Sequence, residues 1–255
     1  MKVTFLGTGT SVGVPAIGCD CATCASTDSR NKRLRSSVLL SHGEARILID
    51  ASFDLRQQAL REKLNRLDAV LLTHGHADHV FGLDDIRMYN YHQRRSVPIY
   101  ATARTASQVR RTFWYVFQES TDASSRPALT LTTVEGPFHL HGLTVRPFDV
   151  LHGQPIITGY RIGRFAYITD GKSLPAASVA ALGGLDLLVI NTLRRTPHPT
   201  HFTLDETLAA IRAIAPRRAL LTHLSHDLEH ESLARELPPE IQPAYDGLTV
   251  EVEAS

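Results

Sequence analysis

Apolar residues in this chain occur mainly in short runs that stop abruptly at polar residues or glycines, and this pattern predicts many buried strands. Several runs end directly at a histidine or an aspartate, so these side chains would lie at strand ends. The segment 41–44 between two runs reads as a hairpin turn. The expected strands are 2–6, 37–40, 46–50, 69–72, 98–101, 129–134, 143–149, 159–162, 165–169, 185–191 and 219–222.

Other segments have apolar residues at a spacing close to that of a helix, namely 53–64, 80–91, 104–118, 175–182 and 203–214. The last begins with Thr203 and Glu206 in the positions of a capping box, which predicts a helix start directly after His201. The segment 104–118 carries adjacent aromatic residues that cannot share one helix face. We expect this band mainly in the core, with a substrate mouth or a subunit contact as the alternative.

The order of these elements predicts two mixed sheets that pack face to face with helices outside, in one domain spanning residues 1–255. A length of 255 residues with 43% hydrophobic content supports such a core. The 27 basic and 26 acidic residues give a net charge of +1, so no overall field favours nucleic acid or an anionic membrane. The sequence shows neither a secretion leader nor a membrane-spanning run, and we expect a cytoplasmic protein.

The segment 73–79, which reads THGHADH, concentrates potential metal ligands at the end of the run 69–72. Imidazole and carboxylate are ligands that zinc and similar divalent metals prefer, and so many at one turn would otherwise repel one another or stay unsatisfied. In a tight turn, His74 and His76 can face one ion while Asp78 and His79 face a second. The segment therefore predicts two metals, and the alternative is a solvated histidine-rich loop.

Four residues cannot complete two metal sites, so further ligands must come from other strand ends. His152, Asp170 and His223 each follow an apolar run. Taken singly, each would pass as a turn histidine or a strand-terminal aspartate. Together with the segment 73–79 they supply the ligands that two metals need.

The THxHxDH motif, followed by a distant histidine, an aspartate after a strand and a final histidine, resembles the metallo-β-lactamase superfamily. The resemblance covers most of the chain and implies an α/β fold, the four-layered αβ/βα sandwich. It is specific for the superfamily and not for a substrate. The ligand sets it implies are His74, His76 and His152 for one ion and Asp78, His79 and His223 for the other, with Asp170 bridging them.

Three cysteines, Cys19, Cys21 and Cys24, lie within six residues, which suits a metal site better than disulfides. This cluster resembles the structural zinc site of the PhnP-type phosphodiesterases, which hydrolyse phosphoribosyl cyclic phosphate. A tetrahedral site needs a fourth ligand, and His226, three residues beyond His223, can supply it. We therefore expect one structural zinc in addition to two divalent ions, manganese or zinc, in the active site.

The same resemblance places a catalytic histidine shortly before the helix that precedes the last ligand. His201 occupies this place, and His198 is a nearby competitor. The implied reaction is attack on phosphorus by a hydroxide that bridges two metals and that Asp170 orients. His201 would protonate the leaving alkoxide or help to hold the phosphate. Arg35 and Arg56 are candidate cations on the phosphate side, and the sequence assigns neither.

We predict a metal-dependent hydrolase that acts on a small cyclic or linear phosphodiester. One alternative is a transfer-RNA 3′-end ribonuclease of the same superfamily, which should carry an extra arm and a basic face. Another is a non-catalytic RNA-binding or scaffold member, which should have lost ligands. A thioester or lactam hydrolase would leave the cysteines and His201 unexplained. We expect neither nucleic acid nor a membrane as partner, and the sequence is compatible with a homodimer.

Overall fold

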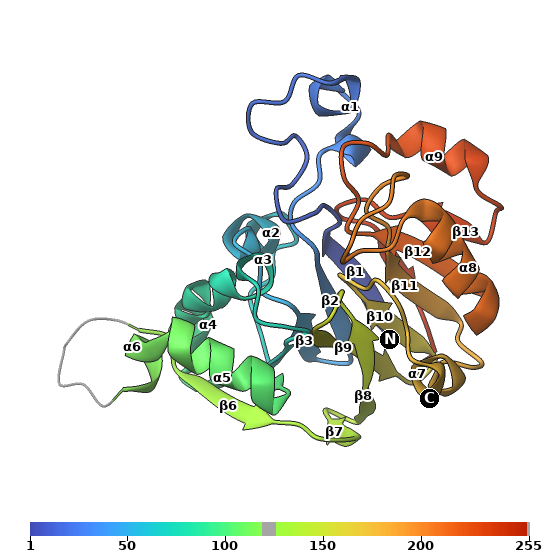
Figure 1. The fold of residues 1–255 in the computed structure, drawn as a ribbon. Coiled ribbons are helices and arrows are strands. Elements are labelled where there is room, and N and C mark those ends of the chain that lie inside the picture. Colours follow the sequence, from blue (N-terminus) through green and yellow to red (C-terminus); the bar gives the residue numbers. More distant parts are fainter. Residues whose placement is uncertain (119–125, 254–255) are drawn as a thin grey trace.

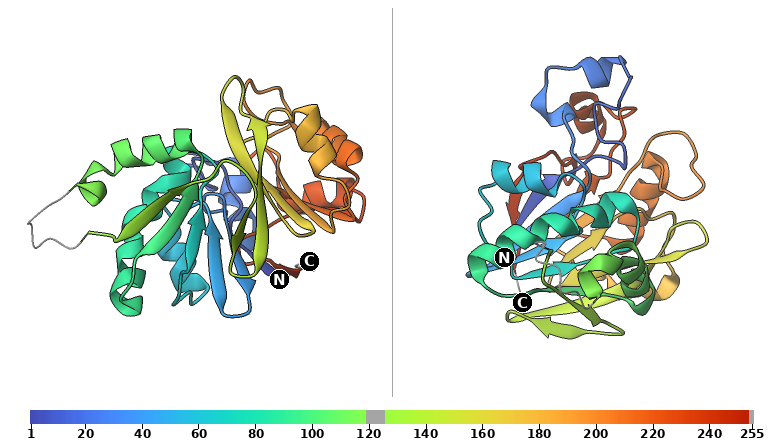
Figure 2. Two further views of the ribbon diagram at one scale, coloured as in Figure 1. Left: turned by 90° about the horizontal axis from the view of Figure 1, so that it is seen from below. Right: turned by 90° about the vertical axis from the view of Figure 1, so that its left-hand side faces the viewer.

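The computed structural model describes residues 1–118 and 126–253. Its strands form two seven-stranded mixed sheets. In Figure 2 the two sheets face each other in the middle of the molecule, with helices on both outer sides. This arrangement confirms the predicted four-layered α/β sandwich.

The first sheet has the strand order β14-β1-β2-β3-β4-β5-β6. Its strands are antiparallel from β14 to β3 and parallel from β3 to β6. Residues near both ends of the described chain lie side by side (Figure 1), and the amino group of Met1 donates a hydrogen bond of 2.8 Å to the carbonyl of Val252. The strands are β1 (Lys2–Gly7), β2 (Ser37–His42), β3 (Ala45–Ile49), β4 (Ala69–Leu71), β5 (Val97–Ala101), β6 (Leu129–Thr133) and β14 (Thr249–Glu251).

The second sheet repeats this plan with the order β13-β12-β11-β10-β9-β8-β7. It is antiparallel from β7 to β10 and parallel from β10 to β13. Parallel neighbours end at the same edge of a sheet, so polar residues that follow them come together. The strands are β7 (Phe138–Leu140), β8 (Leu143–Leu151), β9 (Ile156–Ile162), β10 (Phe165–Ile168), β11 (Leu187–Asn191), β12 (Arg218–Thr222) and β13 (Ile241–Pro243).

Helices cover the outer face of each sheet. Those from α2 to α5 bury apolar side chains against the first sheet, and α8 and α9 do so against the second. The short α1 and the 3₁₀ helix η1 stand apart from these layers, beside the segment that leads to α9 (Figure 1). The helices are α1 (Ala22–Ala25), η1 (Ser29–Asn31), α2 (Leu55–Arg61), α3 (Ala77–Val80), η2 (Phe81–Ile86), α4 (Arg87–Gln93), α5 (Ala103–Thr112), α6 (Trp114–Phe117), α7 (Ala176–Ala181), α8 (Leu204–Ile214) and α9 (His230–Glu236).

The core between the sheets fixes how the strand ends face each other. Tyr160 of β9 is fully buried, and its hydroxyl donates to the carbonyl of Leu72 at 2.8 Å. The amide of Thr158 donates to the carbonyl of Thr73 at 3.0 Å. Both bonds join the second sheet to the residues just beyond β4. The histidine-rich segment is therefore anchored to the second sheet as well as to the first.

The structure corrects the predicted helices in two places. The segment 104–118 is not one helix, because Phe113, with φ −105° and ψ 41°, separates α5 from α6. Phe113 is buried whereas Trp114 is exposed, so the aromatic band lies only partly in the core. The segment 80–91 is divided among α3, η2 and α4. Within the described part of the chain, every helix is too short or too polar to cross a membrane.

Candidate metal centre

The predicted ligands lie where strands of both sheets end. His74 follows β4 closely, His152 follows β8, Asp170 follows β10 after one residue, and His223 follows β12. Asp170 and His223 have positive φ angles of 56° and 55°, a backbone region that is costly for residues with a Cβ. Such strain persists where the surrounding structure holds it, and it concentrates at functional sites.

These strand ends bring the seven predicted active-site ligands together. The ligand atoms of one group of four, and those of a second group of three, lie within 4.8 Å of one another. Asp170 belongs to both groups, as expected of a bridging ligand. Asp78 lies just outside them, with its Oδ2 3.2 Å from Nε2 of His79. The first group is His74, His76, His152 and Asp170, and the second is His79, Asp170 and His223.

A further buried carboxylate, Asp50, orients this cluster. Its Oδ1 accepts a hydrogen bond of 2.8 Å from the amide of Thr73, and its Oδ2 accepts one of 2.8 Å from the Thr73 hydroxyl. Oδ2 also accepts a bond of 2.7 Å from Nδ1 of His79. Asp50 was predicted only as the end of a strand, yet it has the same signal as Asp170, an aspartate directly after an apolar run.

Hydrogen bonds to one ring nitrogen leave the other nitrogen of several histidines available for a metal. Nδ1 of His152 donates to the carbonyl of Thr200 at 2.9 Å, which turns Nε2 into an acceptor. Nε2 of His79 is buried and has no hydrogen-bond partner among the described residues. Carboxylate oxygens of Asp78 and Asp170 each lie 3.2 Å from it. A cation between these atoms would satisfy all three groups, so the residues fit a divalent metal.

The buried carboxylates of the cluster also indicate a site for a divalent metal. The carboxylates of Asp50, Asp78 and Asp170 are buried, and none contacts a lysine or arginine within the described residues. Burial alone would lower the pKa of His79, but Asp170 and Asp50 raise it well above its ordinary value. Burial lowers the pKa of His223 to about 4, which keeps this ring neutral and able to bind a metal.

His201 lies against Asp170, and His198 lies behind His201. Nε2 of His201 is 3.1 Å from Oδ2 of Asp170. On its other side, Nδ1 of His201 is 2.9 Å from the hydroxyl of Thr200 and 3.1 Å from Nδ1 of His198. Of the two histidines that the sequence left in competition, His201 therefore contacts the cluster and His198 contacts His201.

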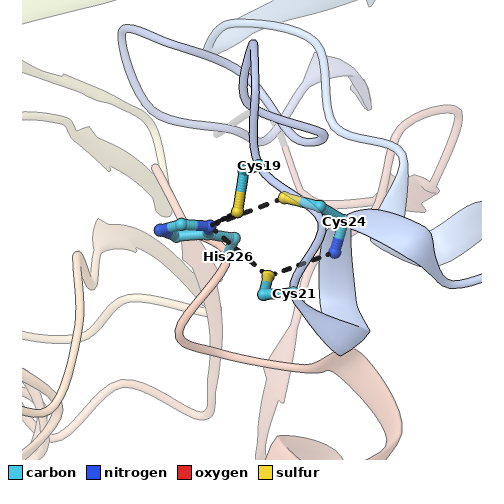
Figure 3. Close-up of side chains that lie close together, drawn as sticks. All are labelled: Cys19, Cys21, Cys24 and His226. Carbon is cyan, nitrogen blue, oxygen red and sulfur yellow. Dashed lines mark hydrogen bonds between the residues drawn. The ribbon is translucent and has the colours of Figure 1, made fainter.

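The three cysteines converge on His226 (Figure 3). Their sulfurs lie 3.1 Å (Cys19), 3.5 Å (Cys21) and 3.5 Å (Cys24) from Nδ1 of His226. A bond from the backbone amide of Cys24 lowers the pKa of Cys21 to about 7, so this sulfur is readily a thiolate. Burial raises the pKa of Cys24 to about 11. The four side chains lie together, as the sequence predicted, and offer three sulfurs and one imidazole nitrogen to a metal.

A buried arginine also connects the N-terminal region to the loop that carries His226. Arg33 is 1% exposed, and its guanidinium donates to the carbonyls of Ser225 at 2.8 Å and Leu228 at 2.6 Å. It also donates to Oδ1 of Asn31 at 3.0 Å. The loop after His223 is thus held by the N-terminal region even without the cysteines. No local pattern in the sequence distinguishes Arg33 from the other arginines of the segment 28–35.

The two arginines that the sequence left unassigned lie in different places. Arg35 forms an ion pair of 3.0 Å with Asp54, and its neighbour Ser36 has its hydroxyl 3.3 Å from Nδ1 of His223. Arg56 lines a groove between α2 and α4 in which none of the predicted ligands takes part. Arg35 is thus adjacent in sequence to a residue that contacts the centre, whereas Arg56 lines a separate groove.

Comparison with known proteins places these features in a family. Residues 45–224 match the model of the β-lactamase superfamily domain. A solved diphosphatase from the PhnP family is 42% identical, with 99% of this chain and 98% of that chain covered and a TM-score of 0.93. Zn²⁺-bound PqqB from Methylobacterium extorquens shares the fold, with 22% identity, 99% and 100% coverage and a TM-score of 0.79.

Among curated proteins, an octanoyltransferase of Porphyromonas gingivalis (strain ATCC BAA-308 / W83) is 42% identical over 253 residues. The match covers 97% of this chain and 51% of that protein. The chain thus spans about half the length of the curated relatives that it matches most strongly.

Proposed function

This chain belongs to the β-lactamase superfamily and, within it, to the PhnP family, and from this premise we propose that it is a metal-dependent hydrolase of phosphodiester-type bonds in small molecules. The observation that carries the proposal is the position of Asp170 in both groups of ligand atoms. His74, His76, His152 and Asp170 would hold one divalent ion, and Asp78, His79, His223 and Asp170 a second. Bound divalent ions, manganese or zinc, acidify water and neutralise charge on phosphoryl oxygens.

The residues around the ligands supply orientation. Asp50 holds His79 through Nδ1, and the Thr73 hydroxyl that donates to Asp50 lies 3.0 Å from Nδ1 of His74. These contacts direct the Nε2 atoms of His74 and His79 toward Asp170. Partners of this kind typically contribute about 10–100-fold to metal affinity or activity. Asp50 is therefore a positioning residue in this proposal.

His201 is the candidate proton donor. Its Nε2 reaches the bridging carboxylate, so a substrate oxygen in that place would lie within proton-transfer distance. A ring that gives up the proton of Nε2 keeps the proton on Nδ1, which faces the Thr200 hydroxyl at 2.9 Å and His198 at 3.1 Å. A general acid is needed because a sugar alkoxide is a poor leaving group. In this proposal His201 protonates the leaving oxygen, and His198 orients the His201 ring from its Nδ1 side.

The 42% identical relative is a diphosphatase, so we include diphosphates beside phosphodiesters among the proposed substrates. In a disubstituted diphosphate, each phosphorus carries one ionised oxygen, as in a phosphodiester, and the leaving group is a phosphate. One site can therefore accept both kinds of bond. The octanoyltransferase is about twice as long as its matched part, so its activity is not assigned to this chain.

We propose in addition that Cys19, Cys21, Cys24 and His226 hold one zinc ion with a structural role. Four ligands close a tetrahedral site and leave no position for a substrate. Since the set joins the N-terminal loop to the loop after His223, its metal would stabilise the second group of active-site ligands indirectly.

A substrate panel tests the proposed function. The purified protein, supplied with manganese or zinc, would be assayed against a cyclic ribose phosphate, a dinucleoside diphosphate, a thioester and a precursor transfer RNA, with EDTA-treated protein as control. We expect hydrolysis of one or both of the first two, and its loss with EDTA. Hydrolysis confined to the thioester or to the transfer RNA would contradict the proposal.

A further inference from the structure

Two exposed phenylalanines lie on segments that carry or orient the predicted metal ligands. Phe53 is 47% exposed and Phe81 is 42% exposed, and their rings meet edge to face with centroids 4.9 Å apart. Phe81 directly follows α3, the helix that carries Asp78 and His79. Phe53 follows the strand end at Asp50 by three residues. Both rings thus extend from segments that hold or orient the predicted ligands.

The backbone locks these two segments together. The amide of Ala51 donates to the carbonyl of His79 at 2.8 Å, and the amide of Gly82 donates to the carbonyl of Ala51 at 2.9 Å. A Cβ at Gly82 would lie 2.1 Å from the carbonyl oxygen of Ser52, so only glycine permits this approach. The backbone segments that carry the two rings are therefore fixed relative to the ligands on the same segments.

Arg35 completes the surface. Its guanidinium lies over the ring of Phe53, with Cζ 5.0 Å from the ring centroid. Bonds to Asp54 at 3.0 Å and to the carbonyl of Ser11 at 2.8 Å hold it in place. On the opposite side, the ring of Phe81 rests on buried Phe113 with centroids 6.0 Å apart. The core thus supports a surface whose outer side stays exposed.

We propose that Phe53, Phe81 and Arg35 form a subsite that receives a planar aromatic ring of the substrate, such as a nucleobase joined to the phosphate through a sugar. Aromatic rings and arginine guanidinium planes are the groups on which proteins stack unpaired bases. The inference rests on the proposed function, because it describes the part of the substrate that is not hydrolysed. The inference predicts that the site binds phosphates that carry an aromatic ring more tightly than sugar phosphates without one.

Binding provides a test that does not depend on turnover. Calorimetry would compare adenosine 5′-phosphate with ribose 5-phosphate on the wild type and on Phe53→Leu and Phe81→Leu, which keep apolar bulk but remove the ring. Tyr91→Leu, at an exposed ring on α4, is the matched control. Stacking contributes enough that we expect the wild type to prefer the nucleotide about tenfold or more, and each phenylalanine variant to lose roughly fivefold of that preference.

Equal affinity of the wild type for both probes would overturn the subsite, as would an equal preference in all variants. If the phenylalanine variants alter only the sedimentation of the protein, the rings form a self-association surface and the inference is wrong. Melting temperatures of the variants near that of the wild type would show that the fold is intact. Should Phe53→Leu unfold, Phe81→Leu carries the test.

A kinetic pair separates this inference from the proposed function. The nitrophenyl esters of thymidine 5′-phosphate and of 2-deoxyribose 5-phosphate share a leaving group and a sugar and differ only in the base. We expect a higher kcat/KM for the thymidine ester, and a smaller ratio in Phe53→Leu. If neither ester is hydrolysed but calorimetry still shows tighter binding of the nucleotide, the proposed function is wrong and the subsite is supported. If both esters are hydrolysed with equal kcat/KM in the wild type and in the variants, the subsite is wrong and the proposed function is supported.

Discussion

The two candidate metal sites differ in their ligands and in what supports them. The centre around Asp170 uses histidines and aspartates placed at the ends of strands in two facing sheets. The cluster around His226 uses thiol groups from a loop near the start of the chain and one imidazole from a loop near its end. Nitrogen and oxygen ligands on a rigid frame suit a site that must admit a substrate. Four ligands with three sulfurs suit a closed site that fastens loops.

The supporting contacts differ in the same way. Asp50 orients the ligands of the first site and is itself fully buried. Around the second site, Arg33 and the Asn31 side chain hold the loop from Ser225 to His230 by its backbone. Substitutions near Asp170 should therefore affect turnover more than stability. Substitutions near the cysteines should do the reverse.

The largest expected effect is that of Asp170→Ala on turnover. This variant removes the carboxylate shared by both groups of ligands, so activity should fall to background while the protein remains folded. Asp186→Ala, at an aspartate that pairs with Arg164 at 3.0 Å before β11, is the control and should keep its activity. Steady-state kinetics and thermal melting measure the two properties. Substantial turnover in Asp170→Ala would contradict the two-metal assignment.

His201→Ala should have the next largest effect, and it should depend on the leaving group. A general acid contributes roughly 10²–10⁴-fold when the leaving oxygen is a sugar alkoxide. Nitrophenolate leaves without such help, so loss on a bis-nitrophenyl diester should be much smaller at equal metal content. His198→Ala is the matched variant and should show a weaker form of this dependence. An equally steep loss on both substrates would mean that His201 holds the phosphate.

Asp50→Asn should lower metal affinity or activity by roughly 10–100-fold, the range for residues that orient ligands. The amide keeps the shape of the carboxylate but cannot accept from His79 and Thr73 with both oxygens. Thr73→Val removes one of these donors and should have a smaller effect. Metal retention during dialysis against graded chelator measures the affinity. Unchanged retention in Asp50→Asn would show that Asp50 is needed only for the fold.

Cys24→Ser should act on stability and on metal count. We expect loss of one metal ion per chain and a melting temperature lower by at least about 5 °C, since each kcal/mol lost in a chain of this size corresponds to about 2–4 °C. Turnover per occupied active site should change much less. Elemental analysis and thermal melting provide the measurements. A variant that is as stable as the wild type but inactive would show that the cysteines take part in the chemistry.

The smallest expected effect concerns Glu229, the N-cap of α9 beside the second site. Burial opposes ionisation, but bonds from Asn31 and from the amides of Ser232 and Glu231 lower its pKa from 4.5 to about 2. Because the folded pKa is depressed, the stabilisation is complete above 4.5 and is lost as pH falls toward 2. Glu229→Gln should cost about 0.5–2 kcal/mol at neutral pH.

The difference between Glu229→Gln and the wild type should shrink as the pH falls from 6 to 3.5. Urea unfolding at several pH values measures it, and turnover at neutral pH should stay close to that of the wild type. A stability difference that is independent of pH would show that the cap acts without its charge.

The sequence alone determined the fold and most of what lies near Asp170. The segment 73–79 and the aspartates and histidines after apolar runs are local signals, because a strand must be apolar and its end is where a polar ligand can begin. The sandwich is confirmed, the capping box at Thr203 is present, and the predicted ligands lie together. Their metal-binding roles stay predictions that the variants above address.

Tertiary structure decided the contacts between residues that are far apart in the chain. Asp50 became a partner of His79, and Arg33 became a buried tie to Ser225, only because strands and loops distant in sequence are adjacent. The break at Phe113 and the exposure of Phe53 and Phe81 also depend on what packs against each ring. The type and order of residues reveal which groups can bind a metal. Only the packed chain reveals which side chain orients another, because burial and hydrogen bonding are properties of pairs that the local pattern does not contain.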